Sequence, residues 1–346
     1  ATATASQGLA FMWEELHIAA GMRCPIVMAN ANRALSAPIN IHGDHSDIMG
    51  VRDTGWAMMF AETAQEAYDN TIIAFKVAED PNVLLPVLTT LDGFVTSHAM
   101  DNCVMEEDQV VKDFVGDYKP LYPLLDTENP VGHGMFATLG NGYMKYKLSE
   151  RHALDNALEA FEKHGKEWAD ITGRSFDLVD SWGTEDADYL IVVLGSCAGN
   201  ARHQARVLRA EGKKVGVVRP RIFRPFPAQQ IVDACKNAKA VAVIDRSDSF
   251  GSPHAPLALE VRAAFQAAGL QIPVSDYIAG LGGAMSVRII HYFMMFVFIA
   301  FTLLHAYLAN IEGLAPSMLM FFGKEHGGLT YDIEKHNISG KDDLAH

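Results

Sequence analysis

The sequence has few basic side chains for its length. It carries 28 lysine and arginine residues against 42 aspartate and glutamate residues, which leaves a formal net charge of −14 at pH 7. A nucleic-acid surface needs clustered Lys and Arg to neutralise phosphate, so this balance argues against a nucleic-acid partner. The chain of 346 residues is long enough for two or three domains, each with its own core.

Cysteine is also scarce. The four cysteines, Cys24, Cys103, Cys197 and Cys235, are spread along the chain without a Cys-x-x-Cys pair. This scatter excludes an iron–sulfur cluster or a structural zinc ion held by cysteines of this chain alone. It is typical of reduced thiols in a cytosolic protein. The sequence shows no signal peptide and no initiator methionine, so we expect a cytoplasmic location for residues 1–283 and a chain that is a fragment or a processed product.

Short apolar runs alternate with amphipathic stretches in the first part of the chain. The runs Cys24–Met28 and Val83–Leu88 predict strands, and the stretch Thr63–Glu79 predicts a helix. This alternation predicts βαβ units on a parallel sheet. A Pro- and Gly-rich connector follows over 119–139, and the interspersed charges of 147–171 predict an exposed helix.

A second α/β unit is predicted over 186–283. Its strands are expected at Tyr189–Leu194, Val215–Arg219, Ala240–Asp245 and Val274–Ile278, and its helices are expected to begin near Ala198, Ala228 and Ala255. The pair Gly195 and Ser196 lies between a strand and a helix, where backbone amides can bind an anion. Such a turn is more often a simple connection, and both interpretations stay open.

Several motifs carry a specific resemblance to one enzyme family. They are Ser-Gln-Gly-Leu at Ser6–Leu9, Ala-Ala-Gly-Met-Arg at Ala19–Arg23, Asn-Arg-Ala-Leu-Ser-Ala-Pro at Asn32–Pro38, Asp-His-Ser-Asp at Asp44–Asp47 and the run Val215–Pro227. Over residues 1–283 the chain resembles the α chain of pyruvate:ferredoxin oxidoreductases. The resemblance implies an α/β fold with a pyrimidine-binding thiamine diphosphate domain over 1–140, a helical connector over 141–185 and a transketolase C-terminal-like domain over 186–283.

The resemblance also implies the reaction and its partners. Members of this family decarboxylate a 2-oxoacid oxidatively, with coenzyme A as acyl acceptor and ferredoxin as acceptor of two electrons, one at a time. Pyruvate is the expected substrate, and branched-chain 2-oxoacids and 2-oxoglutarate are the alternatives. Thiamine diphosphate is shared with the β subunit, which binds the magnesium ion, and the iron–sulfur clusters belong to partner subunits.

Three family features have no counterpart in this sequence. In the family, a glutamate that activates thiamine diphosphate and a Thr-Pro loop beside the substrate both lie upstream of the motif at Ser6. The diphosphate-binding Gly-Asp-Gly motif is also absent, which fits an α chain because the β chain carries that motif. We therefore expect this chain, as written, to be catalytically inactive even with its partner subunits.

Arg33 is the candidate catalytic and substrate-binding residue. A cationic donor must orient the substrate carboxylate, and a guanidinium group does so with a planar pair of N–H groups. Arg33 follows the apolar run Pro25–Ala29 within a few residues, at the end where open α/β sheets place ligands. The alternative is an arginine that ties its own loop to Asp44 or Asp47.

The same resemblance implies roles for neighbouring residues. Asn32 is expected beside the substrate, and Ser6, Gln7 and Gly8 are expected to contact the cofactor. The group Asp44, His45 and Asp47 has two interpretations, a metal cluster or a turn with local side-chain hydrogen bonds, and the second is more typical of such loops.

The sequence changes character after Gly283. The apolar run Ile289–Ile311 predicts a transmembrane helix within 286–312, because about 20 such residues span a bilayer core of roughly 30 Å. A polar tail follows over 313–346. His291 and His305 lie within about 40° of one another around this helix and about 21 Å apart along it. With Arg288-x-x-His291, residues 286–346 resemble the final helix of the b-type cytochrome of nickel–iron hydrogenases, where two such histidines are axial haem ligands.

Two further hypotheses therefore accompany the oxidoreductase subunit. The first is a membrane-anchored electron-transfer protein with haem b at His291 and His305 and a membrane or hydrogenase partner. Each haem needs a second ligand from another helix, which the family places in an earlier part of the cytochrome and this sequence lacks. The second hypothesis is an accidental junction of two gene fragments without a joint function.

Overall fold

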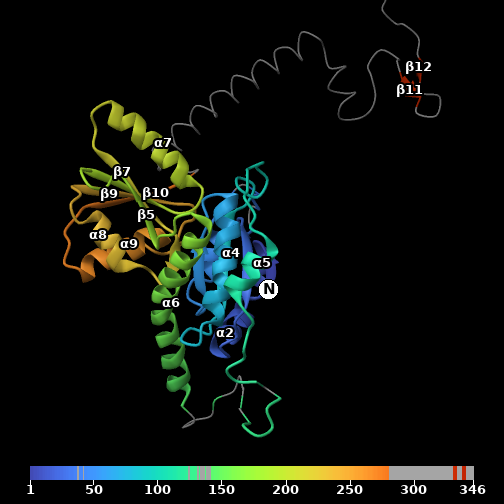
Figure 1. Cartoon of the computed structure of the whole chain (residues 1–346). Helices are drawn as coiled ribbons and strands as arrows, with labels where there is room; N and C mark the ends of the chain where they lie inside the picture. The colour runs from blue at the N-terminus through green and yellow to red at the C-terminus, as the bar shows by residue number, and fades with distance from the viewer. Residues whose placement is uncertain are drawn as a thin grey trace, which may run out of the picture. The chain divides into compact units, whose positions relative to one another are not determined.

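The computed structural model describes residues 1–36, 39–41, 43–123, 125–130, 132, 137, 142–279, 330–332 and 337–339. The chain divides into two compact units, Ala1–Gly280 and Leu281–His346. In the second unit, the described residues form an antiparallel pair of short strands, β11 (Thr330–Asp332) and β12 (Asn337–Ser339) (Figure 1).

The first sheet of the Ala1–Gly280 unit has the strand order β1-β2-β4-β3-β8. The strands are β1 (Thr2–Thr4), β2 (Val27–Asn32), β4 (Val87–Asp92), β3 (Ala57–Phe60) and β8 (Ile222–Arg224). Four of them are parallel, as predicted, whereas β8 pairs antiparallel with β3 and comes from a much later part of the chain. Every residue of β3 is buried, as expected for a strand with both faces covered.

The second sheet has the strand order β10-β9-β6-β7-β5. Its strands are β10 (Val274–Ile278), β9 (Ala240–Asp245), β6 (Tyr189–Val193), β7 (Val215–Pro220) and β5 (Val179–Trp182). The first four confirm the predicted strands, and β5 adds an antiparallel edge that the pattern did not predict. The predicted helix starts are confirmed within one residue by α7 (Cys197–Ala210), α8 (Ala228–Cys235) and α9 (Pro256–Ala267).

Helices cover both faces of each sheet (Figure 1). In the second sheet, α7 lies on one face and α8 and α9 lie on the other. In the first sheet, α4 (Ala64–Glu79) packs on one face, and α5 (Asp108–Val115) packs against α4. The opposite face is covered by α1 (Gln7–Phe11), α2 (Trp13–Gly21) and α3 (Ser46–Gly50).

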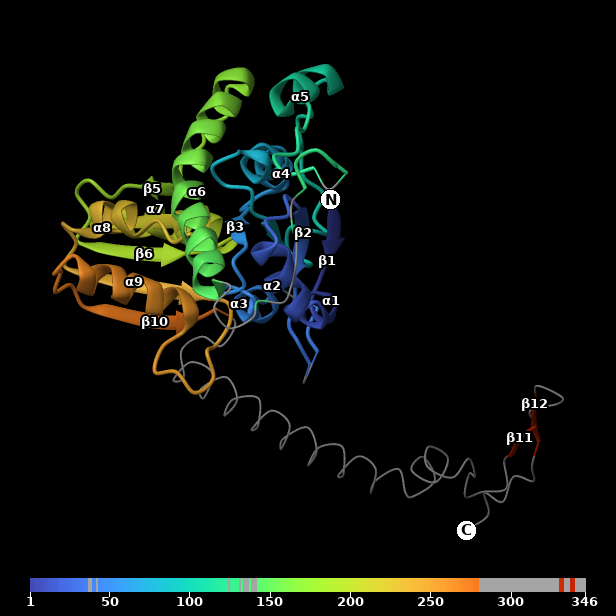
Figure 2. The ribbon, with the colours of Figure 1, turned by 90° about the horizontal axis from the view of Figure 1, so that it is seen from below.

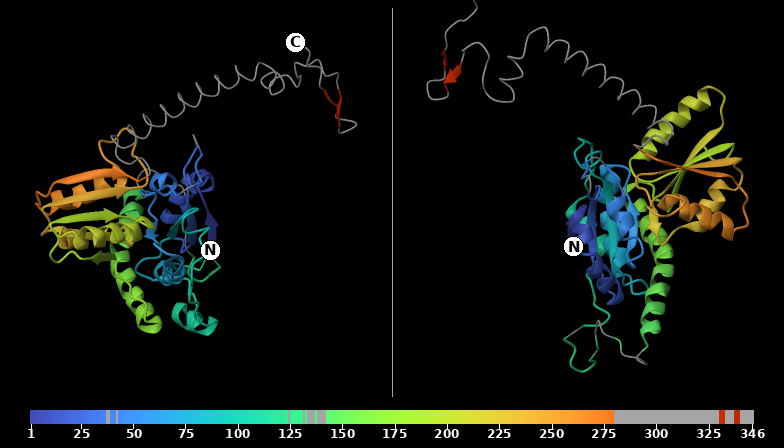
Figure 3. Two further views of the ribbon diagram at one scale, coloured as in Figure 1. Left: turned by 90° about the horizontal axis from the view of Figure 1, so that it is seen from above. Right: turned by 180° about the vertical axis from the view of Figure 1, so that it is seen from behind.

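Helix α6 (Tyr143–Thr172) is longer and more buried than the exposed helix predicted over 147–171. It lies beside α4 (Figure 2, Figure 3). Ala153, Ala157, Phe161 and Trp168 recur at one or two helical turns and form a buried face. The prediction of an exposed helix was wrong for this face, because small alanines among charged side chains made the apolar stripe inconspicuous.

The predicted transmembrane helix over 286–312, with His291 and His305, lies outside the described residues. Within the described ranges, no helix is both long enough and apolar enough to cross a membrane.

Candidate functional site

The carboxyl ends of β1, β2 and β4 meet at one edge of the first sheet. Ser6 lies two residues after β1, Asn32 is the last residue of β2 and precedes Arg33, and Asp92 is the last residue of β4. Open α/β sheets bind ligands beyond the carboxyl ends of their strands. The predicted substrate and cofactor residues therefore lie at the edge that this architecture uses for ligands.

Asp47, on α3, holds this edge together. Its carboxylate is buried. Oδ2 accepts hydrogen bonds from the backbone N–H groups of Ser6 (2.9 Å) and Arg33 (3.1 Å) and from Nδ2 of Asn30 (3.1 Å). Burial raises the pKa of Asp47, and these hydrogen bonds oppose the shift. One side chain thus fixes the loops after β1 and β2 relative to each other.

The guanidinium group of Arg33 forms no ion pair with any described carboxylate. Asp47 binds the backbone N–H of Arg33, and Asp44 Oδ1 accepts a hydrogen bond from the backbone N–H of Ser46 at 2.6 Å. Among the described residues, therefore, the Arg33 side chain does not tie its loop to either carboxylate. Nε of Arg33 and Oδ1 of Asn30 are buried and have no hydrogen-bond partner in the part of the chain that the structure describes. A polar, anionic ligand would satisfy the guanidinium group.

The carboxamide of Asn32 is buried and used within the chain. Its Nδ2 donates to Oγ1 of Thr90 (2.9 Å), and its Oδ1 accepts a hydrogen bond from Nδ2 of Asn30 (2.8 Å). These contacts link β2 to β4 and orient Asn30, whose own Oδ1 has no partner within the described ranges.

The segment with Ser6, Gln7 and Gly8 turns sharply into α1. Ser6 is buried with a φ of 49°, and its Oγ donates to the carbonyl oxygen of Ala34 at 2.6 Å. Gln7 donates to a hydroxyl of the loop after β2 at 3.1 Å. Gly8 packs so closely on β1 that a Cβ there would lie 2.5 Å from Oγ1 of Thr4. Both donors of Ser6 are used within the chain, so this segment shapes the edge.

Asp92 forms a second buried centre that the sequence motifs do not reveal. Its Oδ1 lies 2.6 Å from Nε2 of His45. Its Oδ2 accepts hydrogen bonds from the backbone N–H (2.8 Å) and Oγ (2.5 Å) of Ser196 and from Nη1 of Arg246 (2.7 Å). Burial opposes ionisation, yet His45, Arg246 and Ser196 hold the pKa of Asp92 well below its usual range. The local sequence signal is an acidic residue directly after an apolar strand.

The turn at Gly195 and Ser196 binds an anion, and that anion is the Asp92 carboxylate of the same chain. Ser196 immediately precedes α7, so the carboxylate lies at the positive end of the helix dipole. The first interpretation, an anion bound by backbone amides, is therefore confirmed for the N–H of Ser196, with a side chain of this chain as the anion.

The Asp44–Asp47 turn forms internal hydrogen bonds, as the second interpretation predicted. Within the part of the chain that the structure describes, no group of three or more His, Cys, Asp or Glu residues could hold a metal ion. The predicted haem ligands His291 and His305 lie outside that part.

Two family profiles match most of the chain. The profile described as pyruvate flavodoxin/ferredoxin oxidoreductase, thiamine diphosphate-binding, matches residues 1–166, and the profile described as pyruvate:ferredoxin oxidoreductase core domain II matches residues 187–289. A curated relative, pyruvate synthase subunit PorA of Thermotoga maritima, is 45% identical over 282 residues, which cover 82% of this chain and 71% of the relative. This chain belongs to the pyruvate:ferredoxin oxidoreductase family. The resemblance carried by the short motifs is thereby confirmed.

Other relatives in the family carry different substrate names. Ketoisovalerate oxidoreductase subunit VorA of Pyrococcus horikoshii is 39% identical over 284 residues, which cover 82% of this chain and 71% of the relative. A solved structure, the 2-oxoglutarate:ferredoxin oxidoreductase from Magnetococcus marinus with 2-oxoglutarate, coenzyme A and succinyl-CoA bound, aligns with a TM-score of 0.56 at 18% identity. The alignment covers 80% of this chain and 49% of that one. It supports the α/β fold of thiamine-dependent enzymes.

Proposed function

We propose that this chain is the α subunit of a thiamine diphosphate-dependent pyruvate:ferredoxin oxidoreductase. In the expected reaction, pyruvate loses CO2, coenzyme A takes the acetyl group and ferredoxin takes two electrons. The 45% identity to a pyruvate synthase subunit supports the reaction class. The observation that carries the substrate site is the buried Nε of Arg33 at the carboxyl end of β2, which has no partner among the residues that the structure describes.

Arg33 is proposed to bind the carboxylate of the 2-oxoacid. Two N–H groups of a guanidinium match the two oxygens of a carboxylate and fix the plane of the substrate. A buried N–H without a partner is unfavourable in the free protein, so an anionic ligand gains the full value of that hydrogen bond. Asp47 holds the backbone of Arg33, and the side chain therefore starts from a defined position.

Thiamine diphosphate, when bound, supplies a nucleophilic carbon that attacks the 2-oxo group. Among the described residues, the unpaired Nε of Arg33 is a donor that fits an anionic group, whereas the unpaired Oδ1 of Asn30 is an acceptor that fits a ligand N–H or O–H group. Ser6, Gln7 and Gly8 are proposed to form the wall toward the aminopyrimidine end through their shape, since the donors of Ser6 are already used. The magnesium ion is expected on the β subunit, and the iron–sulfur clusters on other partner subunits.

Substitution of Arg33 tests this assignment in the oxidoreductase assembled from the partner subunits and an α chain that also carries the activating glutamate. We expect Arg33→Ala to lower kcat/KM for pyruvate-dependent ferredoxin reduction by at least about 100-fold, because a paired, charge-assisted contact contributes about 3 kcal/mol. Arg33→Lys keeps the charge but not the paired geometry and should recover part of the loss. Arg151→Ala, which removes an exposed arginine of α6, is the matched control and should behave as wild type. Wild-type kcat/KM in Arg33→Ala would overturn the assignment.

The apolar run over 289–311 is the reason to retain the membrane-anchor hypothesis as a second candidate. Its haem ligands His291 and His305 and its membrane or hydrogenase partner remain predictions. A tryptic digest from the native source tests the join through the peptide Ala263–Arg288. If that peptide is present, a haem absorption band in washed membranes should weaken in His305→Ala. If the two parts occur only on separate proteins, the anchor hypothesis fails.

A further inference from the structure

The loop that carries Arg33 takes its position from the neighbouring turn of residues 44–47. Asp47 Oδ2 accepts a hydrogen bond from the backbone N–H of Arg33 at 3.1 Å, and Ser46 Oγ accepts one from the backbone N–H of Leu35 at 3.1 Å. Two consecutive residues of the turn therefore hold both sides of the Arg33 loop. A displacement of the turn would displace the guanidinium group with it.

His45 anchors the 44–47 turn to the rest of the protein. The side chain of His45 is buried, with its ring edge-to-face on Phe60 at 5.2 Å between centroids. Its Nε2 lies 2.6 Å from Asp92 Oδ1, whereas its Nδ1 has no partner among the described residues. The proton that joins His45 to Asp92 therefore lies on Nε2. The backbone N–H of His45 donates to the carbonyl oxygen of Arg246 at 3.1 Å.

Asp92 connects the 44–47 turn to the second sheet through hydrogen bonds. Ser196 follows β6 and Arg246 follows β9, and both donate to Asp92 Oδ2. The carboxylate is fully buried, and its negative charge is balanced by the guanidinium group of Arg246 at 2.7 Å. Asp92 thus joins the end of β4 to the turn and to the ends of two strands in the other sheet.

We propose that Asp92 is a positioning residue for Arg33, acts through His45 and the 44–47 turn, and thereby sets the affinity of the enzyme for the carboxylate of its 2-oxoacid substrate. This inference rests on the proposed function. Asp92 itself is covered by His45, Ser196 and Arg246, so its effect on the substrate passes through the turn.

Asp92→Asn tests the proposal in the same active assembly, whose α chain also carries the activating glutamate. The amide keeps the volume but turns an N–H group toward a partner that is itself a donor, so the anchor of the turn is weakened. We expect KM for pyruvate to rise about 10-fold while KM for coenzyme A stays unchanged. In an Arg33→Ala background, Asp92→Asn should produce no further loss in kcat/KM for pyruvate, because two residues that act as one unit are not additive.

The control is Asp69→Asn. Asp69 is a buried carboxylate of α4 with comparable contacts, to Arg174 (2.8 Å) and Trp168 (2.8 Å), but away from the substrate edge. It should leave both KM values unchanged. If Asp92→Asn does not assemble, Ser46→Ala removes one contact of the Arg33 loop without altering a buried charge, and KM for pyruvate should rise about 3-fold.

Three results would overturn the positioning role. The first is an unchanged KM for pyruvate in both Asp92→Asn and Ser46→Ala. The second is an equal rise in KM for coenzyme A. The third is a loss of kcat/KM in the double variant Arg33→Ala/Asp92→Asn that equals the sum of the two single effects, expressed as free energies. These results are distinguishable from a failure of the proposed function, which would appear as wild-type kinetics in Arg33→Ala itself.

Discussion

Asp245 ends β9 with a buried carboxylate that faces the start of α9. Its two oxygens accept hydrogen bonds from the backbone N–H groups of Leu257 (3.0 Å) and Ala258 (3.2 Å). Burial raises the pKa of Asp245 to about 6, although these hydrogen bonds oppose the shift. The folded protein therefore binds a proton at this residue more tightly than the unfolded chain, in which the pKa is about 3.9.

The sign of the resulting pH dependence follows from linkage. Between pH about 4 and about 6 the unfolded chain releases this proton first, so the contribution of Asp245 to stability falls as the pH rises. We expect Asp245→Asn to be more stable than wild type by about 2 kcal/mol at pH 7.5. This figure already subtracts about 1 kcal/mol for the hydrogen-bond acceptor that asparagine lacks. At pH 4 the variant should have no such advantage. Urea denaturation at both pH values measures it. Asp113→Asn, at an exposed position of α5, is the control, and an equal gain at both pH values would contradict the prediction.

At the level of single residues, sequence motifs single out Arg33 as a candidate, a role that stays a prediction, but they do not single out Asp92. Arg33 is identifiable because its residue type and its place after an apolar strand are both local properties. The partners of Asp92 lie 47, 104 and 154 residues away in the sequence. Only the pairing of the strand ends brings them together, and no local pattern encodes it.

Gly165 allows α6 to pack closely on Phe176. A Cβ at position 165 would overlap the Phe176 ring. That ring is buried and cannot easily move, since the Arg221 guanidinium lies 4.8 Å from its centroid. The glycine therefore serves a contact between elements rather than a backbone conformation.

We expect Gly165→Ala to destabilise the protein by about 1–2 kcal/mol. Alanine gains about 1 kcal/mol in helix propensity, but overpacking of a tight contact costs about 1–3 kcal/mol, and the overlap here is severe. The midpoint of urea denaturation measures the change. Phe176→Leu should be destabilising alone yet should reduce the effect of Gly165→Ala when the two are combined. A Gly165→Ala variant more stable than wild type would show that the Phe176 ring can move to make room for the added methyl group.

At the level of elements, the predicted strands and helices are those whose signal is contained in their own residues. The helix over Thr63–Glu79 is confirmed as α4, with Thr63 Oγ1 accepting a hydrogen bond from the backbone N–H of Glu66 as an N-cap. The strands β5 and β8 are short edge strands that exist through antiparallel pairing with a partner, so their sequences carry little periodicity.

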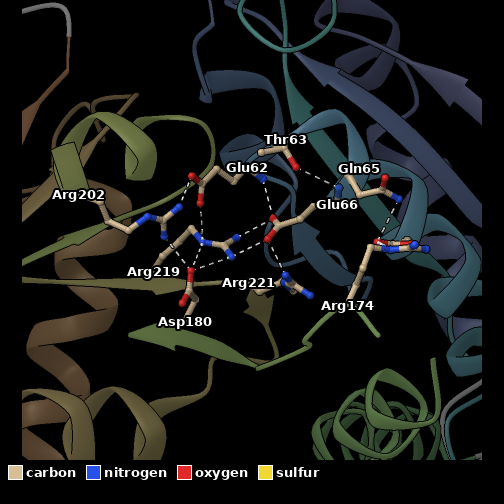
Figure 4. A network of polar contacts seen from close by, with 10 residues as sticks. Glu62, Thr63, Gln65, Glu66, Arg174, Asp180, Arg202, Arg219 and Arg221 are labelled. Atoms are coloured by element: carbon tan, nitrogen blue, oxygen red, sulfur yellow. Dashed lines mark hydrogen bonds and ion pairs between the residues drawn. The ribbon is translucent and has the colours of Figure 1, made fainter. Parts of the chain in front are cut away.

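A network of ion pairs joins the elements of the first sheet to the second (Figure 4). Arg219 on β7 is 1% exposed and donates to both oxygens of Glu66 on α4 (2.9 and 2.8 Å) and to Asp180 on β5 (3.2 Å). Arg221 also pairs with Glu66 at 2.5 Å. Burial opposes ionisation, but Arg221 and Arg219 hold the pKa of Glu66 below its usual value.

We expect Arg219→Ala to lower the free energy of unfolding by about 3 kcal/mol, because Glu66 loses one of its two buried guanidinium partners and keeps only Arg221. Arg151→Ala breaks an exposed pair with Asp155 on α6 and should cost less than about 1 kcal/mol. Chemical denaturation of both variants at pH 7 provides the comparison. Similar losses in the two variants would mean that solvent screens the network around Arg219 as well.

The strand β8 has a consequence for biosynthesis. It completes the first sheet beside β3, yet the ribosome makes it only after β5, β6 and β7. During translation one edge of the apolar strand β3 therefore stays unpaired until β8 is made. An unpaired apolar strand edge can pair with other nascent chains. A recombinant piece that stops at residue 166, where the first family profile ends, would keep that edge permanently. The segment that the first family profile matches and the segment that completes the first sheet are thus different lengths of the same chain.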